Sequence, residues 1–307
     1  MVEENKTSGW FICERCHGLG LENGQRCKNC KGQGVGWFGA NCWLFVSWPT
    51  KWQALKEKLI SQKILSILDV IVYLAAISGV MVMIWHIGQA TSWFLNWSAV
   101  GTLAWWIQPI WPIKWFAWSG VFGLFAVYRL IKSSQEAKLP QWPDVNIATP
   151  LDWQGIFELP AKNKLNVADY LPKEVSSSLA RATVQAGRSK IDQLTPEKWF
   201  SILLNDSLVK ALLFRLNLNV QAIADKLKKY EVKGNNPCSV VSLSAGVKIA
   251  LIQGVASAWS VNDPPLTVDF LSPLIKHSSL LKEIIYDLGA KEEQFAAVAN
   301  WFHINRH

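Results

Sequence analysis

Two copies of the pattern CxxCxGxG stand close together near the N-terminus, between Cys13 and Gly34. In each copy two cysteine thiolates can bind one metal ion, and the glycines that follow permit a tight turn whose backbone amides face the sulfur atoms. Two such pairs supply the four ligands of a tetrahedral site. The sequence therefore predicts a metal site formed by Cys13, Cys16, Cys27 and Cys30.

The predicted site is closed, because four thiolates leave no open coordination position. We expect one structural Zn2+ that stabilises a module at residues 1–45, which could bury too little surface to fold alone. His17 is expected to be a bystander, and a pair of disulfides is the alternative use of the cysteines. The doubled pattern resembles half of the cysteine-rich domain of DnaJ-type chaperones. That domain has four repeats and two zinc ions, so the resemblance implies the zinc site alone and not the family's polypeptide-binding role.

A long apolar run extends from Ile64 to Trp85, with Asp69 as its one charged residue. As a helix this run is about 33 Å long, which matches a hydrocarbon core of about 30 Å. We expect one span at about residues 64–87 and a second at about residues 111–131, with a Trp-rich interfacial segment between them. Residues 60–135 would then form a transmembrane helical hairpin.

Tryptophan and basic residues predict how this hairpin sits in the membrane. Twelve of the 18 Trp lie between Trp37 and Trp118, as expected for an interfacial belt. Lys and Arg precede the first span and follow the second, and none lies between Ile64 and Ile113, so both termini should face the cytoplasm. The alternative is three spans, with an extra helix at about residues 93–110. Asp69 also leaves open a channel or transporter subunit, although two spans need oligomerisation to enclose a pore.

Beyond the hairpin the chain changes character twice. Prolines punctuate residues 136–172, which predicts a linker. From residue 173 to residue 303 the apolar residues fall at helical spacing, and this segment aligns with itself at a constant offset of 72 residues without a gap. We therefore expect two copies of a four-helix unit, which makes the fold class mainly α.

The two copies read LTPEKWFSILLNDSLVKALLFRLNLNVQAI and LTVDFLSPLIKHSSLLKEIIYDLGAKEEQF. This duplicated pattern resembles the N-terminal domain of Clp-type AAA+ unfoldases, a double four-helix repeat that binds substrates or adaptors. The resemblance implies a protein-binding role for residues 173–303. In some members of the family an acidic residue at the start of the second helix binds a modified arginine, which maps onto Glu197 and Asp269. The alternative is a carboxylate at position N2 that only complements the helix dipole. Trp199, Trp259 and Trp301 are candidates for an apolar recognition patch, or else members of the core.

The sequence carries no motif for catalysis or nucleic-acid binding. It lacks any Gly-Lys dipeptide, and so a Walker A loop, and it also lacks HExxH and GxSxG. Its five His form no acid-base arrangement that the sequence reveals. The net charge of +8 is spread along the chain rather than clustered, which argues against nucleic-acid binding.

Together these features predict a multi-pass protein of the cytoplasmic (inner) membrane that is not an enzyme. It would recognise client proteins or a Clp-type unfoldase at the cytoplasmic face, with the lipid bilayer as its other partner, and it could form an oligomer. The alternative is that these residues are the sensor and anchor part of a larger membrane-bound AAA+ ATPase.

Overall fold

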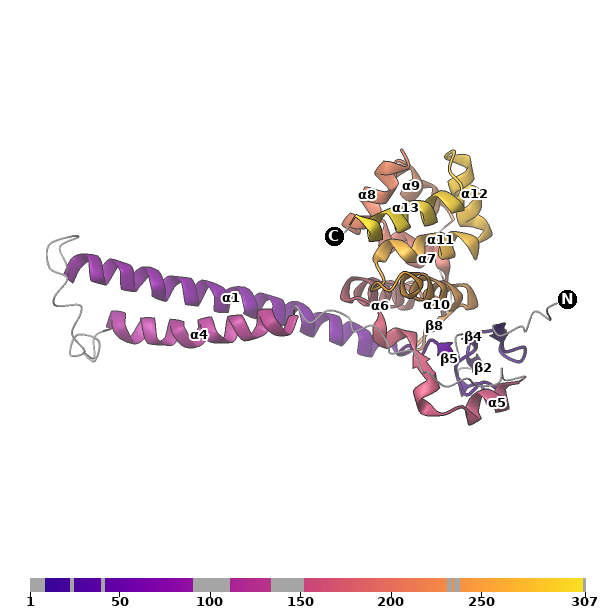
Figure 1. The fold of residues 1–307 in the computed structure, drawn as a ribbon, viewed down its shortest axis with the longest axis horizontal. Coiled ribbons are helices and arrows are strands. Elements are labelled where there is room, and N and C mark those ends of the chain that lie inside the picture. Colours follow the sequence, from indigo (N-terminus) through magenta and orange to yellow (C-terminus); the bar gives the residue numbers. More distant parts are fainter. Residues whose placement is uncertain are drawn as a thin grey trace. The chain divides into compact units, whose positions relative to one another are not determined.

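The computed structural model describes residues 9–22, 25–39, 42–90, 111–133, 152–230, 234 and 238–305. The described residues are mainly helical with some sheet (Figure 1). The chain divides into two compact units, one formed by Met1–Leu59 with Ala137–His307 and the other by Ile60–Glu136. The predicted Trp-rich segment, and with it the choice between two and three spans, lies outside the described residues.

The N-terminal part of the first unit is built on a four-stranded sheet. Its strands, in spatial order, are β1 (Gly9–Ile12), β4 (Val35–Gly39), β5 (Cys42–Phe45) and β6 (Lys164–Asn166). The first three pair in antiparallel fashion, whereas β6 pairs with β5 in parallel. Trp43 on β5 is fully buried, because Gly36 on β4 leaves space for its indole ring. A separate hairpin of β2 (Leu21–Glu22) and β3 (Gln25–Arg26) lies between the two cysteine pairs.

The prediction of a linker at residues 136–172 is wrong over its second half. This half contains α5 (Trp153–Glu158), two 3-10 helices, η1 (Ala161–Asn163) and η2 (Val167–Tyr170), and strand β6. Ile156 packs with Trp43 of the sheet, and Val167 belongs to the helical core. Proline spacing misled the prediction, because Pro160 is the N-cap of η1 rather than part of an extended linker. Elements this short also leave no periodic pattern in a sequence.

Two sets of helices follow along the chain. The first set is α6 (Lys173–Arg188), α7 (Pro196–Leu203), α8 (Ser207–Arg215) and α9 (Val220–Lys229). The second set is α10 (Ala245–Ser260), η3 (Thr267–Phe270) continuing as α11 (Leu271–Lys276), α12 (Ser279–Asp287) and α13 (Glu292–Ile304). The starts of α6 and α10, of α8 and α12, and of α9 and α13 are each 72 residues apart, which is the offset at which the sequence aligns with itself.

The matching starts of α8 and α12 have a local cause. Asp206 caps α8, and its carboxylate accepts hydrogen bonds from the backbone amides of Leu208 and Val209. Ser278 occupies the equivalent position before α12 and accepts from the amide of Leu281. Such caps satisfy amides that have no partner within the helix, so each copy begins its third helix at the same point.

The sheet and the two sets of helices share one core. Helix α10 packs against β4 and β5 as well as against η3 and α11 (Figure 1). Two short strands, β7 (Gln193–Leu194) and β8 (Ser242–Leu243), pair in parallel ahead of α7 and α10. The largest fully buried side chains of this core are Trp199, Phe200, Phe270 and Phe295. Leu44 and Val46 also belong to this core, so the N-terminal sheet packs with the helices and does not form a separate domain.

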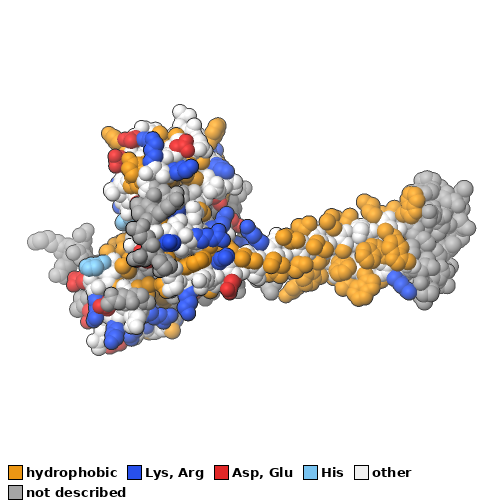
Figure 2. Space-filling model, turned by 180° about the vertical axis from the view of Figure 1, so that it is seen from behind, with side chains coloured by type: hydrophobic (Ala, Val, Ile, Leu, Met, Phe, Trp, Pro, Cys, Tyr) orange, Lys and Arg blue, Asp and Glu red, His pale blue; other side chains and the backbone are white. Residues whose placement is uncertain are grey.

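The second unit contains α4 (Trp111–Ser133) and the part of α1 (Trp52–Ala90) from Ile60 onward. By length and composition, one described helix is apolar enough to cross a membrane, namely Trp52–Trp85 of α1. Lys114, three Trp residues and Tyr128 make α4 less apolar, and its span stays a prediction. Large apolar side chains nevertheless point outward from both helices (Figure 2). They include Ile64, Ile67, Leu68, Leu74, Ile77 and Met81 on α1, and Trp118, Val121, Leu124 and Phe125 on α4.

Helices α1 and α4 contact each other through small and polar residues. The Trp115 indole donates a hydrogen bond of 3.3 Å to the Ser78 hydroxyl. A Cβ atom placed on Gly79 would lie only 2.1 Å from the Cβ of Ser119, so the helices approach closely at this glycine. Small residues permit such contacts between helices in a membrane.

Gly79→Leu is therefore expected to destabilise the α1–α4 pair by about 1–3 kcal/mol, the usual cost of overpacking. Gly123→Leu is the matched control, because a Cβ on Gly123 would meet nothing within 4 Å. Thermal unfolding of the full chain in detergent micelles, followed by circular dichroism, measures the difference. Equal melting temperatures for the two variants would contradict the close contact.

Candidate functional site

The four predicted cysteine ligands lie together in the structure. Every pair of their Sγ atoms is within 4.8 Å, and all four residues are buried. The Sγ atoms of Cys13 and Cys27 are 3.9 Å apart, and those of Cys16 and Cys30 are 3.6 Å apart. A tetrahedral zinc ion with Zn–S bonds of about 2.3 Å needs sulfur atoms about 3.8 Å apart. The cluster can therefore hold one metal ion with four sulfur ligands.

Each cysteine pair is followed by the turn that the glycines predict. The backbone amides of Gly20 and Gly34 each donate a hydrogen bond of 3.2 Å to a ligand sulfur, that of Cys16 and that of Cys30 respectively. Both glycines have positive φ, 79° and 75°. A Cβ on Gly20 would also lie 2.2 Å from a carbonyl oxygen of the other turn, so the two turns pack directly on each other. His17 is exposed and is not among the grouped ligands, as expected for a bystander.

Helix α10 contributes a buried lysine to this centre, which the sequence analysis missed. Lys248 has 4% of its surface exposed, and its ammonium group donates hydrogen bonds to the carbonyl oxygens of Gly18, Leu19 and Gln33. Burial lowers the pKa of Lys248 to about 8, although the nearby sulfur atoms of Cys16, Cys30 and Cys13 oppose the shift. A charged residue inside the apolar run GVKIALI was the available signal.

The acidic residues at the two helix starts are engaged within the fold. Glu197 lies at N2 of α7, as predicted, and its carboxylate accepts a hydrogen bond from the Ser278 hydroxyl. Asp269 lies at N3 of η3 rather than at N2, because Leu266 and not Thr267 is the N-cap. Its carboxylate accepts from the Leu266 amide at 2.6 Å. The capping geometry explains why an acidic residue stands here, and Asp269 is buried, with 7% of its surface exposed.

The prediction of a recognition patch formed by Trp199, Trp259 and Trp301 is wrong for Trp199 and Trp259. Trp199 is fully buried, donates from its indole to the Ser178 hydroxyl at 3.1 Å and packs against Phe270. Trp259 has 5% of its surface exposed and packs against the Tyr170 ring. Both indoles therefore belong to the core and are closed to a partner.

Other aromatic side chains of the helical repeat are exposed instead. Phe214 on α8 and Tyr286 on α12 have 84% and 73% of their surface exposed. They are 72 residues apart and thus occupy the same position in the two copies. Trp301 on α13 is 38% exposed, and the Arg215 guanidinium lies over its ring at 3.4 Å from the centroid. The alignment of Phe214 with Tyr286 could have revealed this pair, but exposure itself cannot be read from helical spacing.

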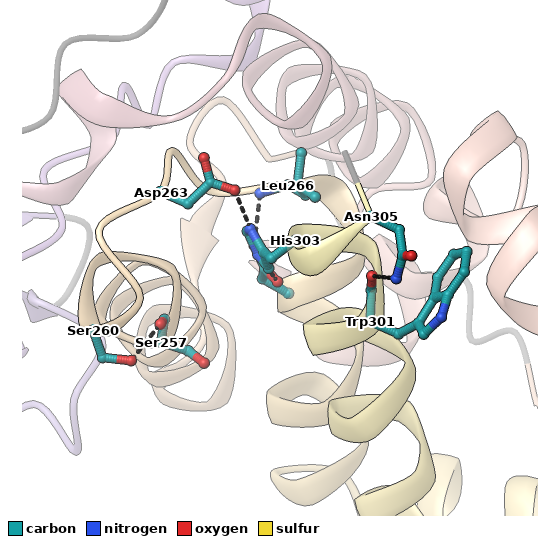
Figure 3. Close-up of polar contacts among 8 residues, drawn as sticks. Ser257, Ser260, Asp263, Leu266, Trp301, His303 and Asn305 are labelled. Atoms are coloured by element: carbon teal, nitrogen blue, oxygen red, sulfur yellow. Dashed lines mark hydrogen bonds and ion pairs between the residues drawn. The ribbon is translucent and has the colours of Figure 1, made fainter. Parts of the chain in front are cut away.

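A histidine between two carboxylates was also missed. His303 on α13 points toward Asp263, which lies in the loop after α10 (Figure 3). The other ring nitrogen, Nε2, lies 2.9 Å from a carboxylate oxygen of Asp269. The His303 side chain is 6% exposed. The hydrogen bonds that the His303 ring donates to Asp269 and Asp263 raise the pKa of His303 to about 9, so the ring is a buried cation near neutral pH. These residues are 34 and 40 positions apart, and no sequence motif marks them.

The raised pKa of His303 predicts that stability falls as pH rises. Below about pH 6.5 its contribution is fully present, and it is lost as pH rises toward about 9, by up to about 1.4 kcal/mol per pH unit. The loss arises because the unfolded chain releases its proton first. Urea unfolding of the full chain between pH 6.5 and 9 measures it, with His303→Leu/Asp269→Asn as the reference. The same pH slope in both proteins would show that His303 does not carry the effect.

Comparison with known proteins finds similarity among solved structures. No family model and no curated protein matches the chain. Among solved structures, the N-terminal domain of the ClpV1 ATPase from E. coli EAEC Sci1 T6SS is similar at 18% sequence identity and a TM-score of 0.39. The similarity covers 44% of this chain and 86% of that one.

Proposed function

We propose that this protein is a membrane-anchored protein-recognition protein. Helix α1, paired with α4, holds it in the cytoplasmic membrane with both termini on the cytoplasmic side. The helical repeat binds client proteins or an unfoldase there, and one Zn2+ stabilises the cysteine-rich part. The observation that carries the proposal is the apolar outer surface of α1 and α4 (Figure 2).

The membrane part of the proposal is supported by the unfavourable hydration of the apolar side chains on α1. Side chains such as Leu74 and Met81 are about 60% exposed on α1, and water around so many large apolar groups is unfavourable by roughly 25 cal/mol per Å². A contiguous apolar surface of this size marks contact with a lipid or protein phase. The bilayer fits better than a protein partner, because the apolar run of α1 has the length of the hydrocarbon core. Lys56, Lys58 and Lys63, just before that run, favour the cytoplasmic side for its N-terminal end.

Helix α1, the proposed membrane anchor, begins within the unit that contains the helical repeat, which supports a tethering mechanism. Leu55, in the first turns of α1, packs with Ala180 and Val184 of α6. The Trp52 indole donates a hydrogen bond of 2.9 Å to the carbonyl oxygen of Cys238. A client bound to the repeat would thereby be kept at the membrane surface, where its effective concentration for a second membrane-bound partner rises without any new contact.

The recognition part of the proposal is supported by Phe214 and Tyr286. Exposed aromatic side chains are enriched in protein interfaces, and here one stands at the same position in each copy. We therefore propose binding rather than catalysis as the function. The duplicated sequence pattern of residues 173–303, which resembles the Clp N-terminal domain, also points to protein binding.

Cell fractionation tests this proposal. Membranes from cells that produce the protein naturally are washed with alkaline carbonate and probed with an antibody against residues 173–303. We expect the polypeptide to stay in the membrane until detergent is added, and the size of its band separates a chain of 34.5 kDa from a longer one. A much larger band would mean that these residues are the front part of a membrane-bound ATPase. Release by carbonate alone would refute the membrane anchor.

A second experiment tests recognition separately. The double variant Phe214→Ser/Tyr286→Ser should lose most of the crosslinks that the full chain forms with other proteins in those membranes. Tyr230→Ser is the matched control, because Tyr230 is 55% exposed, whereas Phe302, its equivalent in the second copy, is partly buried, so the exposed position is not shared by the two copies. An unchanged crosslink pattern in the double variant would exclude these two side chains as the recognition surface.

A further inference from the structure

We propose that Lys248 is a positioning residue of the metal centre, acting on two ligand sulfur atoms through two backbone peptide groups. The inference rests on the metal site of the proposed function. It makes the centre a composite of two distant parts of the chain, because Lys248 comes from α10 and the four ligands come from the N-terminal turns.

The hydrogen bonds around Lys248 form two matching relays. The Lys248 ammonium donates to the Leu19 carbonyl at 2.7 Å, and the amide of the same peptide group, that of Gly20, donates to the sulfur of Cys16 at 3.2 Å. The second relay has the same form. The ammonium donates at 3.0 Å to the Gln33 carbonyl, and the next amide, that of Gly34, donates to the sulfur of Cys30 at 3.2 Å.

One cation therefore polarises one peptide group in each cysteine turn. A carbonyl that accepts a charged hydrogen bond makes the N–H of its own peptide group a stronger donor, because hydrogen bonds in a chain strengthen one another. Stronger N–H donors stabilise the negative charge on a thiolate ligand. Groups outside the direct ligands that orient and polarise them commonly change metal affinity by about 10–100-fold.

A purely structural role explains the lysine less well. Lys side chains near a surface usually extend so that the ammonium reaches water. Here the ammonium is turned inward onto three carbonyl oxygens, at the cost of removing a charge from water. Four thiolates around Zn2+ carry a net charge of −2, so a buried cation beside them is compensated when the metal is bound. The arrangement is thus best satisfied in the metal-loaded state.

Cobalt substitution of the full chain in detergent micelles tests the relay. In Lys248→Met the sulfur-to-cobalt charge-transfer band should move to longer wavelength, because weaker N–H donors leave the sulfur electrons less stabilised. The affinity for Zn2+, measured by competition with a chelator, should fall about 10–100-fold. Lys28→Met removes an exposed lysine of the second cysteine turn and should change neither quantity. An unchanged band and affinity in Lys248→Met, or equal changes in both variants, would overturn the proposal.

Labelling of the unaltered chain covers the case in which Lys248→Met does not fold. Acylation of lysines by an amine-reactive ester is followed by mass spectrometry before and after metal removal. Lys248 should react faster in the metal-free chain, because its ammonium group is no longer held against the carbonyl oxygens, whereas Lys28 should react equally in both. Equal rates for Lys248 would overturn the proposal. A chain that binds neither cobalt nor zinc would refute the metal site itself, whereas unchanged metal binding in Lys248→Met refutes only the role of Lys248.

Discussion

Cys13→Ser/Cys27→Ser is expected to reduce the metal content of the purified chain from one ion per chain to nearly none. The substitution removes one sulfur ligand from each cysteine turn, and the two remaining thiolates cannot close a tetrahedral site. In small zinc-binding peptides the structural ion contributes about 10–16 kcal/mol to folding, so the cysteine turns should unfold without it. Elemental analysis of the protein in detergent micelles, together with its melting temperature, measures both effects.

Two controls define this result. Cys238→Ser should keep the full metal content, because Cys238 lies outside the cluster of ligands. Membrane association of the double variant should be unchanged, because α1 and α4 hold no ligand. One equivalent of metal in Cys13→Ser/Cys27→Ser would show that the four cysteines are not the site.

His303→Leu is expected to cost the helical repeat about 3–5 kcal/mol, which is typical of removing one partner of a buried ion pair. The loss would leave the Asp269 carboxylate buried, with 3% of its side chain exposed and the Leu266 amide as its remaining partner. Chemical unfolding of the full chain in micelles, with and without the substitution, gives the difference in free energy of unfolding.

A double-mutant cycle separates this charge effect from lost packing. Adding Asp269→Asn to His303→Leu should recover much of the loss, because the neutral amide can still accept from the Leu266 amide. Asp263→Asn should cost less than His303→Leu, since the Asp263 side chain is 15% exposed and can reach water. If Asp263→Asn costs as much as His303→Leu, the buried pair of His303 and Asp269 is not the main contribution.

Features that depend on local spacing could be predicted from the sequence. The cysteine spacing identified the four residues that come together, because a CxxC turn is a local structure. The offset of 72 residues likewise predicted where α8 and α12 begin. Asp206 and Ser278, at equivalent positions of the two copies, are the N-caps of these helices.

Features that depend on distant contacts could not be predicted. Strand β6 pairs with β5 across more than a hundred residues, so its three residues carried no recognisable pattern. Trp199 occupies a helix position that could face either core or solvent. It faces the core because it packs against Phe270, which is distant in the sequence. Lys248 and His303 are ordinary residues in the sequence, and they matter because α10 and α13 bring them to carbonyl and carboxylate groups from other elements.

The orientation of both ends of the chain tests the central claim most directly. Epitope tags are placed at the N- and C-termini of the full chain, and sealed membrane vesicles of known orientation are treated with protease. We predict that both tags are digested when the cytoplasmic face is outside and that both are protected in the opposite orientation. Tags on opposite faces would contradict the hairpin, and digestion of both tags in either orientation would contradict the membrane anchor.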